Sequence, residues 1–262
     1  MLQEKQPFSV LRRSSGEVKR YRTYNRVVPV AIGVIVALLV VVYVLSLLFN
    51  KYGSFTVSIK DINDRRYGLS LSETDKFLHA TSRLNSNAAK DIDNIDGNTL
   101  PDNLNDINGE HNGENYVAYT FYVKNSGEVA CSYEYSLVVT RATVNIDAAA
   151  RVRVYYNADY YKAATDTYNY SGAYTDYAKP STSGNGKPEV DPDNRVMTNF
   201  ASANVVCEGR TDEFAPGDIC KITIVIWLEG NDPDCTDEVL GGQLKLDMNF
   251  TIVGTTDDGE AE

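Results

Sequence analysis

The feature that most constrains the fold of this chain is an alternation of apolar and polar residues with a period of two. Successive side chains of a β-strand point to opposite faces, so this period indicates strands with one buried face, as in an antiparallel sheet packed on a core. Three shorter apolar segments, 55–59, 150–156 and 203–207, are further strand candidates. Seven or eight strands predict an all-β fold of the sandwich type. The clearest alternation is found at 116–123, 131–139, 221–228 and 243–252.

Residues 27–49 carry no charge and are almost all Val, Leu, Ile and Ala. A helix of this length measures roughly 35 Å at about 1.5 Å per residue, which is enough to cross a hydrocarbon core of about 30 Å. The segment therefore predicts one transmembrane helix that acts as an uncleaved signal anchor. The alternative is a cleaved signal peptide, whose apolar region usually has about 7–15 residues and ends at a small-x-small site.

The charge distribution predicts the orientation of this helix. Residues 1–26 contain seven basic and two acidic side chains, a balance of +5, which leaves −16 on the remainder of a chain whose net charge is −11. By the positive-inside rule, residues 1–26 form a basic cytoplasmic segment and the C-terminal part is extracellular. The expected localisation is the cell membrane, single-pass, with the lipid bilayer as one partner. The acidic balance argues against nucleic acid as a partner.

The predicted outer part consists of an extracellular β-sandwich domain at 50–253 and an acidic tail at 254–262. Two stretches rich in Asn, Asp, Gly or Pro, near 91–115 and 178–195, are expected to be exposed polar inserts. A capping-box pattern predicts one short, peripheral helix over 72–84.

All four cysteines lie in the predicted outer part, where disulfides can persist. Cys207 and Cys220 are separated by 12 residues between two candidate strands, and a hairpin there would bring their Cβ atoms within about 4 Å. The sequence therefore favours a Cys207–Cys220 bridge if any forms. The alternative is that all four thiols are free.

Acidic residues crowd the turn that follows the strand candidate 221–228. Carboxylate oxygens are the ligands that Ca²⁺ prefers, so the turn is a candidate calcium site, and calcium is the one cofactor considered. The alternative is a solvated acidic turn in which some of the carboxylates cap the backbone. The candidate ligands are Glu229, Asp232, Asp234, Asp237 and Glu238.

The sequence predicts no catalytic residue and no enzyme activity. Only two histidines, His79 and His111, are present, which excludes the HExxH motif and most His-dependent triads. Thirteen tyrosines lie between Tyr116 and Tyr177. They either line an exposed surface suited to stacking on sugars or fill one face of a sheet.

Three segments carry a resemblance to a known family. They are the strand and turn at 119–127, the stretch at 148–155, and the run 216–235, which contains Ile-Trp-Leu-Glu-Gly-Asn-Asp-Pro-Asp-Cys and is followed by Gly241-Gly242. Together they resemble the TasA/camelysin-like secreted proteins of Gram-positive bacteria. The resemblance implies a jelly-roll sandwich related to subunits of biofilm-matrix fibres, which assemble by lending a strand to a neighbour.

The expected function is that of a membrane-anchored structural or interaction protein that holds or nucleates biofilm-matrix or cell-surface assemblies. The first strand candidate, 55–59, follows the span closely, so free polymerisation through that strand should be hampered. Its expected partners are further copies of itself or proteins of the matrix and cell wall. The alternatives are a carbohydrate-binding adhesin and, as the resemblance to camelysin implies, a surface metalloprotease.

Overall fold

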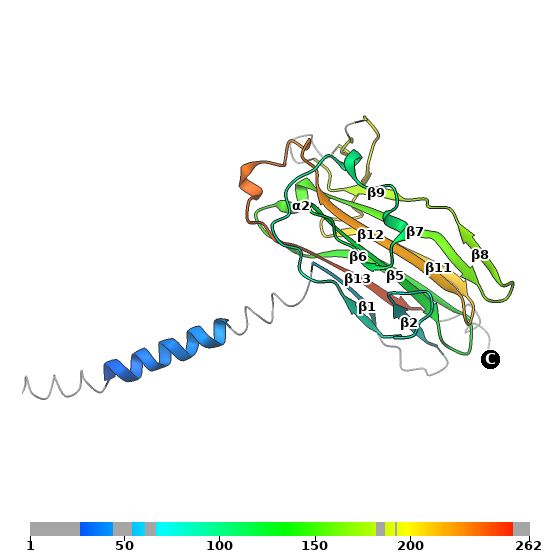
Figure 1. Ribbon diagram of the computed structural model, residues 1–262, viewed down its shortest axis with the longest axis horizontal. Helices are drawn as coiled ribbons and strands as arrows, with labels where there is room; N and C mark the ends of the chain where they lie inside the picture. The colour runs from blue at the N-terminus through cyan, green and yellow to red at the C-terminus, as the bar shows by residue number, and fades with distance from the viewer. Residues whose placement is uncertain (1–26, 44–53, 61–66, 182–186, 192, 254–262) are drawn as a thin grey trace, which may run out of the picture. The chain divides into compact units, whose positions relative to one another are not determined.

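The computed structural model describes residues 27–43, 54–60, 67–181, 187–191 and 193–253 (Figure 1). The predicted cytoplasmic segment 1–26 and the acidic tail 254–262 lie outside the described residues. The chain divides into two units, Met1–Asn50 and Lys51–Glu262.

The first unit contributes one helix, residues 27–43, whose side chains are nearly all exposed. The rest of the predicted span, 44–49, lies outside the described residues. In the part of the chain that the structure describes, no helix has the length and apolar character needed to cross a bilayer.

The second unit is built from two β-sheets (Figure 1). The five-stranded sheet has the order β11-β6-β13-β1-β3, and the eight-stranded sheet has the order β10-β9-β7-β12-β5-β2, with β4 added to β5 and β8 added to β7. The strands of the first sheet are β11 (Val205–Phe214), β6 (Cys131–Ala142), β13 (Leu244–Ile252), β1 (Phe55–Lys60) and β3 (Arg83–Asn85). Those of the second are β10 (Thr198–Asn199), β9 (Thr175–Ala178), β7 (Ala150–Lys162), β12 (Ile219–Leu228), β5 (Tyr116–Asn125), β2 (Leu69–Ser72), β4 (Gly109–Glu110) and β8 (Thr167–Tyr170).

The predicted all-β, sandwich-like character is confirmed, but the sheets are not purely antiparallel. The strand β1 runs parallel to β13, and β10 runs parallel to β9. Antiparallel pairing was expected because one-sided alternation is typical of it, yet alternation reports only which face is buried and not the direction of the neighbouring strand. The helix predicted over 72–84 is also wrong, because this stretch contains the end of β2, turns and the start of β3.

Aromatic side chains join the inward faces of the two sheets. Phe121 of β5 is fully buried, and its ring centroid lies 6.2 Å from that of Phe55 on β1 and 6.1 Å from that of Phe250 on β13. Tyr133 of β6 packs edge-on against Phe250 at 5.8 Å. The two contacts of Phe121 cross the space between the sheets, whereas Tyr133 and Phe250 are neighbours within the five-stranded sheet. The main core is therefore the interior of the sandwich.

The outer face of the eight-stranded sheet is covered as well. Leu100 and Leu104 pack over it in a second cluster that includes Val225 and Trp227. This corrects only part of the prediction for 91–115: Leu100, Leu104, Asn105 and Gly109 are buried, while the rest of the stretch is exposed or half-buried. The strands β5 and β12 are buried on both faces. The outward face of β12 carries Val225 and Trp227, whose apolar surface the covering removes from water.

Polar contacts fix the segment 97–106, which we call the covering segment, to the sheet. The Lys221 ammonium donates to the main-chain carbonyl of Asn105, and the Thr223 hydroxyl donates to Asn105 Oδ1 at 2.8 Å. Asn105 lies in the short 3₁₀ helix η2 (Leu104–Asp106) and is buried. Two further 3₁₀ turns, η1 (Gly97–Thr99) and η3 (Asp237–Val239), and the short helix α2 (Ile146–Ala149) complete the described elements of the second unit.

Replacing Phe121 by Ala should destabilise the second unit by about 3–5 kcal/mol, because it removes a ring that both sheets contact and leaves a cavity. Urea unfolding followed by the fluorescence of Trp227, the single tryptophan, measures the change. Leu78→Ala serves as the control, since Leu78 is exposed and its truncation should change the free energy of unfolding by less than about 0.5 kcal/mol. Equal decreases in the free energy of unfolding of the two variants would contradict the role of Phe121 in joining the two sheets.

Candidate functional site

Three carboxylates come together beside the loop that follows β12. Oxygens of Glu189, Asp232 and Asp234 all lie within 4.8 Å of one another. Glu189 and Asp232 are buried, while Asp234 is half-buried. We call these three residues the acidic cluster. Three carboxylates at such distances repel one another strongly unless a cation balances them.

A buried arginine supplies part of that balance. Arg151, at the start of β7, is 1% exposed, and its Nη2 forms an ion pair with Asp232 Oδ2. The same Nη2 lies 3.7 Å from Glu189 Oε2. Its Nη1 donates to the carbonyls of Ala148 and Ala150 at 3.2 Å each. The guanidinium is thereby held in place, and with all groups ionised the arginine and the acidic cluster carry a net charge of −2.

Local turns present the aspartates. The Asp232 amide donates to the Glu229 carbonyl at 3.2 Å, and the Cys235 amide donates to the Asp232 carbonyl at 2.9 Å. Asp232 Oδ1 in turn accepts from the Asp234 amide at 2.7 Å. Asp232 therefore acts as a backbone cap, as the alternative reading of this turn expected, and it also belongs to the acidic cluster.

Glu189 reaches the cluster from a separate segment. Its carbonyl accepts from the Met197 amide at 2.9 Å, and a β-bridge joins Val190 to Val196. This reversal of the chain between residues 189 and 197 holds Glu189 beside the loop that follows β12. It also corrects part of the prediction for 178–195: within the described residues of that stretch, Ala178, Glu189 and Asp191 are buried.

Burial raises the pKa of the Glu189 carboxyl, and the neighbouring charge of Asp232 raises it further, whereas Arg151 and Ser181 lower it. Only 8% of Glu189 is exposed, and its Oε1 atom is buried without a hydrogen-bond partner among the residues that the structure describes. A buried carboxylate oxygen without a partner is costly, since it has lost its water and gained nothing in exchange. A cation or a proton bound at this carboxylate would therefore stabilise the folded chain.

The five predicted calcium ligands do not all meet. Asp232 and Asp234 lie in the acidic cluster. Glu229 faces elsewhere: its carboxylate accepts from the Gly97 amide and the Trp227 indole, both at 3.1 Å, and from Asn231. Glu229 thus ties the covering segment to β12.

The other two predicted ligands, Asp237 and Glu238, are exposed and belong to η3, where the Thr236 hydroxyl accepts from the Glu238 amide. Sequence reasoning missed Glu189 because it is 40 residues or more from the turn, and no pattern in its own segment marks it as a ligand.

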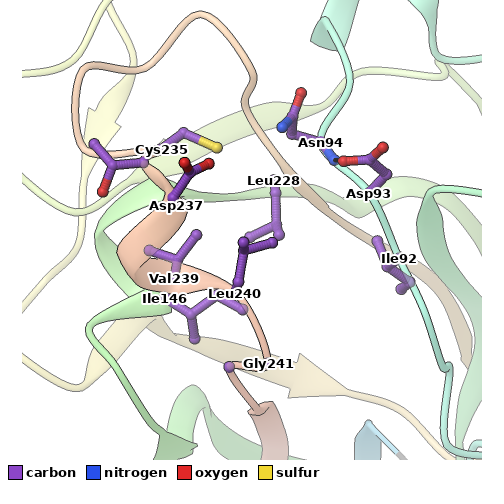
Figure 2. Close-up of a pocket in the computed structure, with 12 residues that line it drawn as sticks. Ile92, Asp93, Asn94, Ile146, Leu228, Cys235, Asp237, Val239, Leu240 and Gly241 are labelled. Atoms are coloured by element: carbon purple, nitrogen blue, oxygen red, sulfur yellow. Dashed lines mark hydrogen bonds between the residues drawn. The ribbon is translucent and has the colours of Figure 1, made fainter.

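A small cavity is lined by residues 235–237 and 239–242, which follow this turn, together with residues 92–94, Ile146 and Leu228 (Figure 2). Its volume is about 140 Å³. Figure 2 shows Cys235, Asn94 and Asp93 at one end, with Val239 and Leu240 among the apolar side chains at the other. Pockets that enclose drug-sized ligands measure about 300–1,000 Å³, so this cavity suits ordered water or one small side chain.

None of the four cysteines, all of which lie in the described residues, forms a disulfide. Cys207 lies on β11, which pairs with β6 in the five-stranded sheet, whereas Cys220 lies on β12, which pairs with β5 and β7 in the other sheet. The hairpin on which the Cys207–Cys220 bridge was predicted is therefore wrong. Consecutive strands of a sandwich often cross from one sheet to the other, and the spacing of two cysteines does not reveal this.

The tyrosines divide between the two expected roles. Tyr119 and Tyr133 are buried in the core, while Tyr168 and Tyr170 on β8 and the nearby Tyr174 are exposed by 55%, 58% and 42%. The Arg153 guanidinium lies 4.0 Å from the centroid of the Tyr174 ring. His79 is exposed and His111 Nδ1 lies 2.9 Å from the Gly109 carbonyl oxygen, so neither histidine joins the acidic cluster.

The fold and these sites define a mostly-β, sandwich-like domain with a buried acidic cluster beside one of its loops. No protein-family model matches the chain, and no curated protein is significantly similar to it.

Thiol labelling should separate Cys235 from the other three cysteines. Cys235 is half-buried and the others are buried, so a thiol reagent should modify about one thiol per native chain and four per denatured chain without prior reduction. Mass spectrometry of the labelled full chain counts them. Two thiols in the denatured, unreduced protein would show that a disulfide forms after all.

Alkaline pH should destabilise the fold. Burial raises the pKa of the Cys207 thiol from 9.0 to about 12, so the unfolded chain ionises first. The stability that the neutral thiol contributes is complete below pH 9 and is lost as the pH rises towards 12. The urea midpoint should therefore fall over this interval, and it should fall less steeply in Cys207→Ala. A midpoint that stays constant up to pH 11 would contradict this.

Proposed function

We propose that this chain is a membrane-anchored extracellular structural and interaction protein, whose β-domain holds or nucleates assemblies of matrix or cell-wall components. The single observation that carries the proposal is the helix of residues 27–43, whose exposed side chains are almost all apolar, next in the chain to a mostly-β domain. Apolar side chains covering every side of a helix are expected where lipid surrounds it.

The sandwich is proposed to be of the jelly-roll type, as the resemblance to TasA/camelysin-like proteins implies. In that family the first strand can complete a neighbouring subunit. In this chain β1 lies between β13 and β3 of its own sheet, with Phe55 and Val57 in the core. Its place in the sheet is thus filled by the chain itself, which supports anchoring and partner binding over release as a fibre subunit.

The long edge strand of the five-stranded sheet supports binding of defined partners over open-ended assembly. Among the described strands, β11 pairs with β6 alone, and it carries the charged side chains Glu208, Arg210 and Asp212. Irregular register interrupts its pairing near both ends. Charge and irregularity on an edge both discourage the addition of further strands.

A carbohydrate-binding adhesin is the second candidate, and the exposed rings of Tyr168, Tyr170 and Tyr174 favour it. Aromatic rings with one free face suit stacking on sugars. The metalloprotease alternative receives less support, since the acidic cluster offers only carboxylate oxygens, whereas catalytic zinc usually binds histidine nitrogen.

Cell fractionation tests the anchor. The full chain should be recovered in the membrane fraction, and protease added to intact cells should degrade its β-domain. A variant that lacks residues 27–49 should appear in the medium or in the soluble fraction, because nothing then holds it in lipid. Recovery of the unaltered chain from the medium, beginning at residue 50 or later, would overturn the anchored form of the proposal.

Glycan binding separates the two candidates. If the chain is an adhesin, the purified full chain in detergent should bind cell-wall glycans, and Tyr168→Ser/Tyr170→Ser should weaken binding by about tenfold through the loss of two stacking rings. Ser70→Ala provides a control, because Ser70 lies on β2, at the edge of the same sheet away from these tyrosines. Absence of glycan binding in the unaltered chain would leave protein partners as the supported class.

A further inference from the structure

The acidic cluster is built as a cation site, and we propose that Glu189, Asp232 and Asp234 bind one Ca²⁺ ion that clamps the segment 189–197 onto the loop that follows β12.

The first argument is charge. Three carboxylates and the Arg151 guanidinium carry a net charge of −2 when ionised, and the oxygens of the three acids lie within 4.8 Å of one another. One divalent cation neutralises this group. Arg151 alone does not neutralise the group. Its Nη2 pairs directly with Asp232, but it lies 3.7 Å from Glu189 Oε2, which is beyond hydrogen-bond range.

The second argument is independent of the clustering. Glu189 is more than nine-tenths buried, its carboxylate belongs to the cluster, and its Oε1 atom has no hydrogen-bond partner within the described part of the chain. Buried carboxylate oxygens are normally satisfied by donors or by a cation. The orphaned oxygen marks a place where positive charge would be stabilised.

The third argument concerns which cation fits. All three ligands offer hard carboxylate oxygens, which suit Ca²⁺, Mg²⁺ or Mn²⁺ more than the softer transition metals. Calcium takes about six to eight oxygens in irregular geometry and accepts both one-oxygen and two-oxygen binding by a carboxylate. Magnesium demands a near-ideal octahedron. Ligands drawn from two separate loops, with one aspartate already shared with an arginine, match the tolerance of calcium.

Binding would have a structural consequence. Glu189 belongs to the chain reversal 189–197, in which the Met197 amide donates to the Glu189 carbonyl and a β-bridge joins Val190 to Val196. Asp232 and Asp234 belong to the turn after β12. One ion shared between them would join the two segments and add stability in proportion to its occupancy. The site shares no residue with the exposed tyrosines or with the helix of residues 27–43, so its test is independent of the proposed function.

Calorimetric titration of the full chain in mild detergent, after chelator treatment, tests the proposal with calcium chloride as the probe. One Ca²⁺ per chain should bind, and the melting temperature followed by Trp227 fluorescence should rise with calcium and return on adding chelator. Glu189→Gln and Asp234→Asn should each weaken binding by at least about tenfold, since each removes a ligand charge. Glu238→Gln, which alters an exposed acid outside the cluster, should bind as the unaltered chain does.

A second signature distinguishes a ligand from a merely structural residue. In chelator, Glu189→Gln should melt at or above the temperature of the unaltered chain, because the substitution removes a buried, poorly balanced charge. In calcium, the order should reverse. Asp232→Asn is less informative, since it also removes the ion-pair partner of the buried Arg151.

Absence of calcium binding and of any melting shift at millimolar calcium would overturn the proposal. So would equal affinities in Glu189→Gln and Glu238→Gln. A response to magnesium or manganese alone would overturn the assignment to calcium.

Discussion

Phe121 lies between Phe55 and Phe250, and this contact across the interior of the sandwich is the interaction on which the rest of the structure depends. It buries the inward faces of both sheets at once, and neither sheet could hide those faces alone. The strand β1 contributes Phe55 and Val57 to the same interior. The N-terminal strand is therefore part of the core of its own domain, which favours a self-contained unit over one that must borrow a strand from a neighbour.

The outer layer follows from the same constraint. The strands β5 and β12 are buried on both faces, because the segment containing Leu100 and Leu104 covers the outward side of the eight-stranded sheet. The backbone of this segment then requires partners, which Lys221 and Glu229 supply, and Thr223 donates to the Asn105 side chain. Acidic residues that look alike in the sequence thus acquire different roles: some satisfy the backbone of the covering layer, and others meet around a buried arginine.

The sequence pattern predicted structure correctly where the residues concerned lie within one strand or one turn. The four alternating segments all became strands, and Asp232 and Asp234 were recognised as neighbours because one short turn contains both. Pattern failed where two distant segments had to meet. Nothing near Glu189 indicates that it reaches the turn after β12, and the spacing of Cys207 and Cys220 does not tell that their strands belong to different sheets.

The sequence by itself determined that the chain would be mostly β with one separate apolar helical segment, since period-two alternation and an uncharged apolar run are properties of consecutive residues. The tertiary structure alone decided that β1 runs parallel to β13, that a polar-looking stretch covers the second face of a sheet, and that Glu189 joins Asp232 beside Arg151. These outcomes depend on long-range packing, in which burying apolar surface outweighs the local preference of polar residues for solvent.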